Sequence, residues 1–123
     1  MAGPENGQPG GDVSGRDWPA RISVEDLDRW RREGVALQLV DVREPWEVEI
    51  CAIEGALNVP LGTLPDHLDR IADDRPVVVL CHHGMRSRNA VAFLRSRGFP
   101  AAINLGGGID AWARRIAPGM ATY

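Results

Sequence analysis

One short segment holds most of the side chains that could do chemistry. It consists of Cys81, His82, His83, Gly84, Met85, Arg86 and Ser87. The thiol of Cys81 becomes a strong nucleophile once it loses its proton, and it can then form a covalent intermediate. Arg86 follows after four residues and adds a permanent positive charge. A thiol and a cation at this spacing predict a nucleophilic cysteine that works on an anion.

Two regular elements must position this segment. The run from Val77 to Leu80 is apolar, mostly β-branched and preceded by Pro76, which predicts a strand buried on both faces in a parallel sheet. A helix is expected to begin at about Ser87 and to stop at Gly98, because apolar residues recur at helical spacing between them. Residues 81–86 therefore form a loop that joins a strand to a helix.

A loop of this kind binds anions. Its backbone N–H groups point toward one place, and the N-terminus of the helix adds partial positive charge there. We therefore expect the thiol to ionise easily. Gly84 is predicted to allow a backbone conformation that a Cβ atom would disfavour, and Ser87 is predicted to cap the helix. His82 and His83 either assist the thiol and a substrate or are exposed loop residues.

Four sequence blocks occur together along the chain. They are D-V-R-E-P-W-E at residues 41–47, I-E-G-A-L-N-V-P-L at 53–61, C-x-x-G-x-R-S at 81–87 and L-G-G-G-I-D-A-W at 105–112. In this order they resemble a single-domain rhodanese, a member of a sulfurtransferase family, and the resemblance covers nearly all of the chain after Trp18. One block departs from the pattern, because Cys51-Ala52-Ile53 stands where the family usually has G-H-I.

The resemblance implies a reaction at Cys81. Its thiolate would attack the outer sulfur of a small donor anion such as thiosulfate, release sulfite and become a persulfide. A thiol, cyanide or a protein that accepts sulfur would then take the outer sulfur, and no cofactor is needed. Arg86 would bound the loop and orient the anionic donor. Asp41 and Arg43 would brace the loop, although an ordinary surface ion pair is the alternative interpretation.

Two other functions stay open. Phosphatases and arsenate reductases of a related fold place five residues between the cysteine and the arginine, whereas only four, His82 to Met85, intervene here. A non-catalytic rhodanese-like interaction module commonly lacks the cysteine, which is present in this chain. A metal site is set aside, because Cys81, His82 and His83 in succession have poor geometry for one ion. Cys51 is interpreted as a packed small residue rather than a second reactive thiol.

The remaining pattern predicts an α/β protein, a rhodanese-like three-layer sandwich with a mainly parallel central sheet flanked by helices. Strands are expected to end at Ile22 and to occupy residues 37–42, 56–59, 77–80 and 101–105. Helices are expected over residues 23–33, 44–50, 64–71, 87–97 and 109–116. Four tryptophans are expected in the core or at its edge: Trp18, Trp30, Trp46 and Trp112.

Composition divides the 123 residues into a tail and one domain. Residues 1–17 are rich in Gly, Pro, Asn and Gln and nearly lack large apolar residues, so we expect a disordered tail before a rhodanese-like domain at 18–123. The net charge of −3 gives no reason to expect nucleic acid, and no apolar stretch approaches the roughly 20 residues of a membrane span. With no secretory signal and only two cysteines, a cytoplasmic protein is expected.

Overall fold

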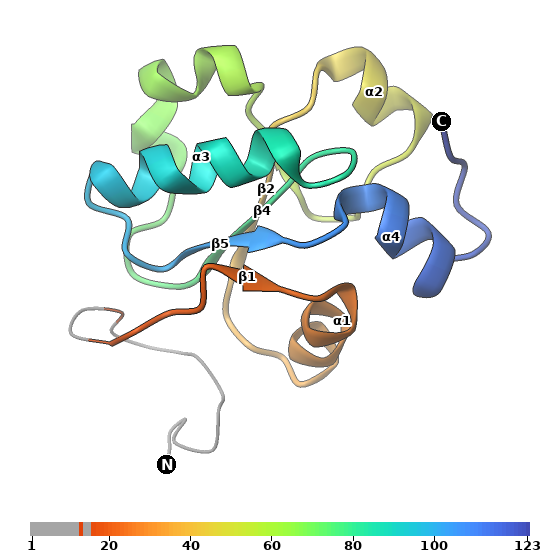
Figure 1. The fold of residues 1–123 in the computed structure, drawn as a ribbon, viewed down its shortest axis with the longest axis horizontal. Helices are drawn as coiled ribbons and strands as arrows, with labels where there is room; N and C mark the ends of the chain where they lie inside the picture. The colour runs from red at the N-terminus through yellow and green to blue at the C-terminus, as the bar shows by residue number, and fades with distance from the viewer. Residues whose placement is uncertain (1–12, 14–15) are drawn as a thin grey trace.

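Five parallel strands form the centre of the protein. The computed structural model describes Val13 and residues 16–123. The strands are β1 (Arg21–Ile22), β2 (Gln38–Asp41), β3 (Leu57–Asn58), β4 (Val77–Leu80) and β5 (Ala102–Leu105). They lie in the order β1-β5-β4-β2-β3, and each of these neighbouring pairs is parallel. β4 is therefore the central strand, with a hydrogen-bonded neighbour on each side (Figure 1).

Helices cover both faces of this sheet. α1 (Val24–Arg32) and α4 (Gly108–Arg115) pack together on one face, and α3 (Met85–Ser96) packs with the 3-10 helix η1 (Leu61–Arg70) on the other. In Figure 1, α3 and η1 lie above the strands and α1 lies below them. The short helix α2 (Pro45–Ile50) follows the end of β2. The predicted α/β three-layer sandwich with a parallel sheet is confirmed.

Alternation along β4 supplies an apolar core to each face of the sheet. Successive side chains of a strand point to opposite faces. Val78 and Leu80 accordingly join the core under α1 and α4, whereas Val77 and Val79 join the core under α3 and η1. All four side chains are fully buried, which explains why this strand is a continuous apolar run in the sequence.

The order of the strands reverses direction at the carboxyl ends of β2 and β4. The chain leaving β2 goes outward to β3, whereas the chain leaving β4 goes to β5 on the opposite side. The loops after the two strands therefore diverge, and open parallel sheets bind their ligands at such a point. Asp41 at the end of β2 is in register with Leu80 at the end of β4, so the residues that follow each strand are neighbours.

Most predicted elements are confirmed in position. Ser23 caps α1, since its hydroxyl accepts a hydrogen bond from the amide of Asp26 while the Asp26 carboxylate accepts one from the amide of Ser23. Pro45 occupies the first turn of α2 as expected, and Gly98 follows the end of α3 with a φ of +97°.

Three local details differ from the prediction. The helix over residues 61–70 is a 3-10 helix, with Pro65 inside it and non-helical geometry at His67. α3 begins at Met85 rather than at about Ser87. Trp46 is 60% exposed, because α2 has only six residues and lies at the surface, whereas the other three tryptophans are buried as predicted.

Residues 1–12 and 14–15, most of the predicted tail, lie outside the described residues. Val13 is described, and it is buried against Trp18, whose indole N–H donates a hydrogen bond to the Val13 carbonyl at 3.1 Å. The composition of the tail had not indicated this contact. In the part of the chain that the structure describes, no helix combines the length and the apolar character needed to cross a membrane.

Candidate active site

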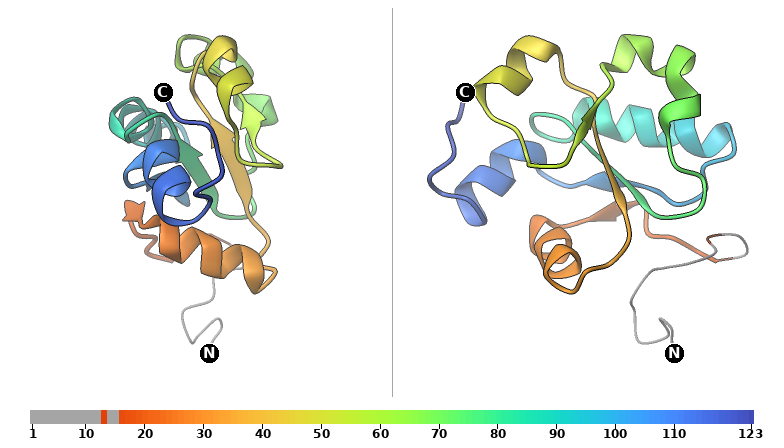
Figure 2. Two further views of the ribbon diagram at one scale, coloured as in Figure 1. Left: turned by 90° about the vertical axis from the view of Figure 1, so that its right-hand side faces the viewer. Right: turned by 180° about the vertical axis from the view of Figure 1, so that it is seen from behind.

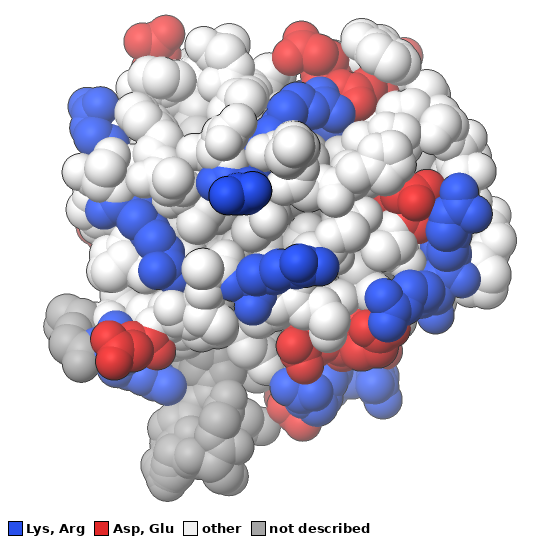
Figure 3. All heavy atoms as spheres, in the orientation of Figure 1, with Lys and Arg blue, Asp and Glu red and all other residues white. Residues whose placement is uncertain are grey.

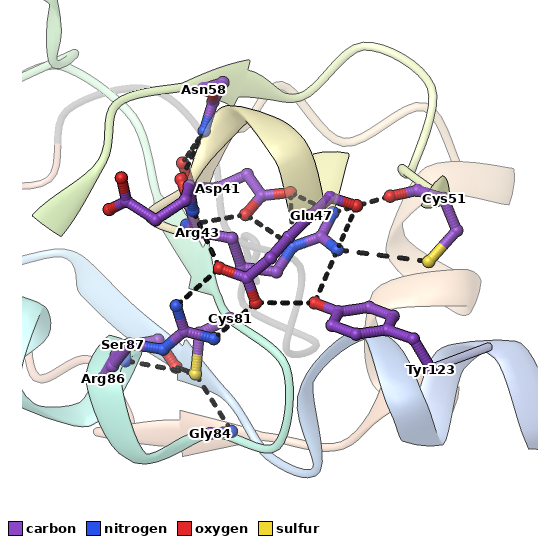
Figure 4. A network of polar contacts seen from close by, with 11 residues as sticks. Asp41, Arg43, Glu47, Cys51, Asn58, Cys81, Gly84, Arg86, Ser87 and Tyr123 are labelled. Atoms are coloured by element: carbon purple, nitrogen blue, oxygen red, sulfur yellow. Dashed lines mark hydrogen bonds and ion pairs between the residues drawn. The ribbon is translucent and has the colours of Figure 1, made fainter. Parts of the chain in front are cut away.

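Cys81 lies at the carboxyl end of the central strand, where its thiol faces a ring of hydrogen-bond donors. The residue is only 1% exposed. Its Sγ accepts hydrogen bonds from the amide of Gly84 at 3.1 Å and from the amide of Ser87 at 3.4 Å (Figure 4). Figure 4 shows the loop closing around the sulfur so that these donors converge on it. The predicted loop between strand and helix is therefore present, with the thiol at its centre.

These donors control the acidity of the thiol. Burial by itself raises the pKa of Cys81, because it disfavours the thiolate. Hydrogen bonds from the Ser87 hydroxyl and from the amides of Ser87, Gly84 and Arg86 outweigh that effect, so the pKa lies below its ordinary value. The groups that stabilise the thiolate are thus neutral dipoles at the start of α3.

Glycine is required at one point in the loop and at one point that packs against it. Gly84 has a φ of +112°, a left-handed conformation that turns the chain into α3, as the sequence predicted. Gly108 starts α4, and a Cβ atom there would lie 2.5 Å from the carbonyl oxygens of Cys81 and His82. This close approach lets the amides of Ile109 and Asp110 donate to those two carbonyls, at 2.9 and 3.1 Å. The Gly-rich block at 105–112 therefore holds the loop through hydrogen bonds to its backbone carbonyls.

Ser87 has a different role from the predicted one. It lies in the third position of α3, and Gly84 takes the N-cap position. The Ser87 hydroxyl is 3.3 Å from the sulfur of Cys81 and 2.6 Å from Oδ1 of Asn104. Because the hydroxyl has one proton, it serves one of these acceptors at a time. Asn104 also donates to the Gly84 carbonyl at 3.2 Å, so this β5 side chain, which the sequence analysis missed, holds the loop as well.

Arg86 is paired with a residue that the sequence analysis also missed. Its guanidinium donates two hydrogen bonds of 2.8 Å to the carboxylate of Glu47 in α2. Glu47 is buried, and its pKa is lowered to about 2, mainly by the Arg86 hydrogen bonds. The same pairing raises the pKa of Arg86. The sequence marked Glu47 only as the last residue of the block at 41–47. It could not show that Glu47 pairs with Arg86, which lies 39 positions away.

Asp41 and Arg43 form a buried ion pair. Their closest contact is 2.7 Å, and the two side chains are 1% and 0% exposed, so the alternative of an ordinary surface pair is wrong. Arg43 also donates to the carbonyls of Glu47 and Cys51. Asp41 raises the pKa of Arg43 in spite of the burial that opposes it. The pair reaches the Cys81 loop indirectly, through Glu47.

Tyr123 completes this group of side chains. Its hydroxyl accepts a hydrogen bond from Arg43 at 3.0 Å and donates one to Glu47 at 2.8 Å. Its ring stacks on the imidazole of His82, with centroids 3.9 Å apart and an angle of 4° between the planes. Both views of Figure 2 show the C-terminal segment ending beside α2. We call Asp41, Arg43, Glu47, Arg86 and Tyr123 the charged cluster.

The other predicted loop residues are less enclosed. His82 has its pKa lowered, first by burial and then by the neighbouring His83, which favours a neutral imidazole. That state argues against a protonated His82 as the source of the low thiol pKa. His83 and Met85 are exposed at the mouth of the loop. Cys51 is half-buried, packs at the edge of the core and lies 4.0 Å from a nitrogen of Arg43.

One group of side chains has the composition of a metal site. His82, His83 and Asp110 bring one potential ligand atom each within 4.8 Å of the others. The two imidazoles are stacked with centroids 3.9 Å apart, so their in-plane lone pairs do not converge on one point. Asp110 already accepts a hydrogen bond from Arg114 at 3.0 Å. We assign no metal to this group.

The fold and the loop together define an α/β protein with a buried cysteine of lowered pKa at the carboxyl edge of a parallel sheet. A family model described as the rhodanese-like domain matches residues 23–115. The chain therefore belongs to the rhodanese-like domain family, which confirms the resemblance drawn from its sequence blocks.

Individual relatives agree with this assignment. The chain is 38% identical over 104 residues to the probable adenylyltransferase/sulfurtransferase MoeZ of Mycobacterium tuberculosis, a match that covers 83% of this chain but 26% of MoeZ. It is 38% identical over 97 residues to a sulfurtransferase of Allochromatium vinosum, covering 79% of this chain and 91% of the relative. The solved structure of a rhodanese-related protein from Thermoplasma volcanium is 32% identical, with a TM-score of 0.72 and coverage of 80% and 94%.

Proposed function

We propose that this protein is a sulfurtransferase that carries sulfur as a persulfide on Cys81. The observation that supports the proposal most directly is the ring of donors around the Cys81 sulfur, including the amides of Gly84 and Ser87. The same donors that stabilise a thiolate can hold the outer sulfur of a persulfide, since both are anionic.

In the first step, the thiolate of Cys81 attacks the outer sulfur of a donor anion such as thiosulfate. The sulfur–sulfur bond of the donor breaks, sulfite leaves with the bonding electron pair, and a persulfide is left on Cys81. In the second step, a thiol or cyanide attacks the outer sulfur and the Cys81 thiolate leaves. No net oxidation occurs, and no cofactor is needed.

Arg86 orients the donor in this proposal. Its two terminal nitrogens each use one hydrogen on Glu47, which leaves further N–H groups on the guanidinium. The side chain is 36% exposed, so an anion at the mouth of the loop can reach it. Asp41 and Arg43 act as supports, because they hold the α2 segment from which Glu47 pairs with Arg86.

Two other functions have less support. A phosphatase or an arsenate reductase needs a loop wide enough for a tetrahedral oxyanion, and only four residues separate Cys81 from Arg86. A non-catalytic interaction module has no need for a thiol of lowered pKa. Of the two activities in the name of MoeZ, we propose only sulfur transfer for this chain. A reducing cytoplasm suits the proposal, because Cys81 must stay a free thiol before each cycle.

Mass spectrometry after exposure to thiosulfate tests this proposal. We expect a mass increase of about 32 Da on Cys81, removed by cyanide, because one sulfur atom is added and then transferred. Cys81→Ser should abolish both the mass increase and thiocyanate formation. Cys51→Ser is the matched control and should keep most activity. Activity lost in Cys51→Ser and kept in Cys81→Ser would refute the assignment.

A further inference from the structure

A groove of about 730 Å³ begins at the Cys81 loop and runs along α3. One wall is α3, and the other is the edge of the sheet at β1 and the segment after β5. The loop end is formed by His83, Gly84 and Met85. This volume lies within the roughly 300–1,000 Å³ of small-molecule sites, whereas thiosulfate or cyanide would fill only a small part of it.

The groove is positively charged. Arg21, Arg88 and Arg95 line it, and among the described residues no aspartate or glutamate does. Figure 3 shows basic side chains over α3 and β1 on this face, with no acidic side chain between them. Arg95 stabilises the fold, because it donates hydrogen bonds to three backbone carbonyls. The groove therefore attracts anions, and two of its cations are not used to hold the fold.

Arg21 and Arg88 are the two available cations. Both are exposed, and in the described part of the chain neither has an ion pair or a side-chain hydrogen bond. Arg21 lies across the backbone of Gly106, where a Cβ atom would collide with its guanidinium. Glycine at that position thus leaves room for the Arg21 guanidinium at the wall of the groove. An unpaired guanidinium offers several N–H donors to a carboxylate or a phosphate.

The groove and the thiol share a wall. Gly84 lines the groove, and its amide donates to the Cys81 sulfur at 3.1 Å. Asn104 also lines the groove and donates to the Gly84 carbonyl. Between the charged side chains the wall is apolar, with Ala20, Val91 and Ala92. A molecule bound here would place one end at the rim of the loop.

We propose that this groove binds the sulfur acceptor, and that the acceptor is a small thiol bearing carboxylate or phosphate groups. The inference rests on the proposed sulfurtransferase function. The anionic groups of the acceptor pair with Arg21 and Arg88, and its thiolate reaches the loop. That thiolate attacks the outer sulfur of the Cys81 persulfide, the sulfur–sulfur bond breaks, the Cys81 thiolate leaves and the acceptor departs as a persulfide.

Paired acceptors test the charge requirement. Mercaptosuccinate, with two carboxylates, is compared with the neutral 3-mercapto-1,2-propanediol, and 4′-phosphopantetheine is compared with pantetheine. The measured quantity is the ratio of kcat/KM for the anionic thiol to that for its neutral partner. This ratio should fall roughly two- to fivefold in Arg21→Gln and in Arg88→Gln, as expected when an exposed ion pair is lost. If this ratio falls more for the mercaptosuccinate pair, the groove recognises carboxylates. If it falls more for the phosphopantetheine pair, the groove recognises phosphates.

Arg97→Gln is the matched control. Arg97 is an exposed arginine just after α3 that does not line the groove, so its loss should leave the ratio unchanged. The inference is overturned if Arg21→Gln and Arg88→Gln leave the ratio unchanged, or if Arg97→Gln lowers it equally.

A binding measurement separates this inference from the proposed function. NMR titration of Cys81→Ser with S-methyl mercaptosuccinate, which cannot react, should shift the amide signals of Gly84, Arg88 and Gly106. The shifts should weaken in the same variant carrying Arg88→Gln. If Cys81 gains no sulfur from thiosulfate but these shifts appear, the proposed function fails and the groove is still an anion site. If sulfur is gained and no shifts appear, the acceptor site is refuted alone.

Discussion

The two sides of the Cys81 loop are built from different interactions. On the side of α3 and α4, neutral groups surround the sulfur and the loop carbonyls: the amides of Gly84 and Ser87, the Ser87 hydroxyl and the amides that follow Gly108. On the side of α2, the charged cluster pairs its own charges almost completely. Dipoles therefore lower the pKa of the Cys81 thiol, whereas the charges hold α2 against the loop.

The two regions contribute differently to the pKa of Cys81, because the dipoles are already aimed at the sulfur and the Arg86 charge is already paired. A dipole already aimed at the sulfur needs no reorganisation when the thiolate forms. The Arg86 charge is largely compensated by Glu47 at 2.8 Å, so less of it acts on the thiolate. Variants that separate the dipoles from the charges test this difference.

Replacing Gly108 by Ala should have the largest effect. The new Cβ would meet the carbonyls of Cys81 and His82 at 2.5 Å, and the φ of +60° is unfavourable for alanine. We expect a loss of about 3 kcal/mol in the free energy of unfolding, together with loss of activity. Gly62→Ala is the matched control, since a Cβ there meets nothing within 4 Å. Equal melting temperatures for the two variants would show that contact with the start of α4 does not hold the loop.

The charged cluster should make stability depend on pH through Glu47. Its folded pKa of about 2 lies below the ordinary value of 4.5, so the stabilisation is present above pH 4.5 and is lost as the pH falls toward 2. Linkage predicts a loss of about 2 kcal/mol between pH 7 and pH 3 from this group. Urea unfolding at the two pH values measures it. Glu47→Gln should be less stable at pH 7 but should lack this part of the acid loss; an identical pH profile in the variant would contradict the assignment.

Ser87 and Arg86 allow a direct comparison of a dipole with a charge. Ser87→Ala removes the hydroxyl that lowers the pKa of Cys81 when it donates to the sulfur rather than to Asn104. We expect it to raise that pKa more than Arg86→Ala does, whereas Arg86→Ala should raise the KM for thiosulfate more. The pH dependence of Cys81 alkylation and steady-state kinetics report the two quantities. Arg86→Lys should restore the charge but not the two-pronged contact with Glu47. A larger pKa change in Arg86→Ala would reverse our assignment of roles.

Tyr123→Phe should have the smallest effect. The variant keeps the ring that stacks on His82 but loses the hydroxyl that joins Arg43 to Glu47. We expect a loss of about 1 kcal/mol, typical of one hydrogen-bonding group, with sulfur transfer retained. Tyr123→Ala removes the stacking as well and should lower activity further. Thermal unfolding of both variants gives the stability, and equal values would show that the hydroxyl alone matters.

Features that depend on near neighbours could be predicted from the sequence alone. The cap of α1 at Ser23, the buried run of β4 and the left-handed turn at Gly84 each rest on residues within a few positions of one another. The order of strands and helices, and with it the α/β class, follows from such local patterns. The proposal that Cys81 is the reactive residue came from the same local context.

The distant residues that meet at the site could not be predicted from the sequence, because the folded sheet brings them together. Glu47 joins Arg86 across 39 positions, and Tyr123 joins Arg43 across 80. Asn104 and Gly108 approach the loop because β5 lies beside β4, which no local pattern specifies. Propensities act through the backbone of a few residues, whereas these contacts depend on how the whole sheet brings its carboxyl ends together. The buried charges and the Arg-lined groove became visible for that reason only in the folded chain.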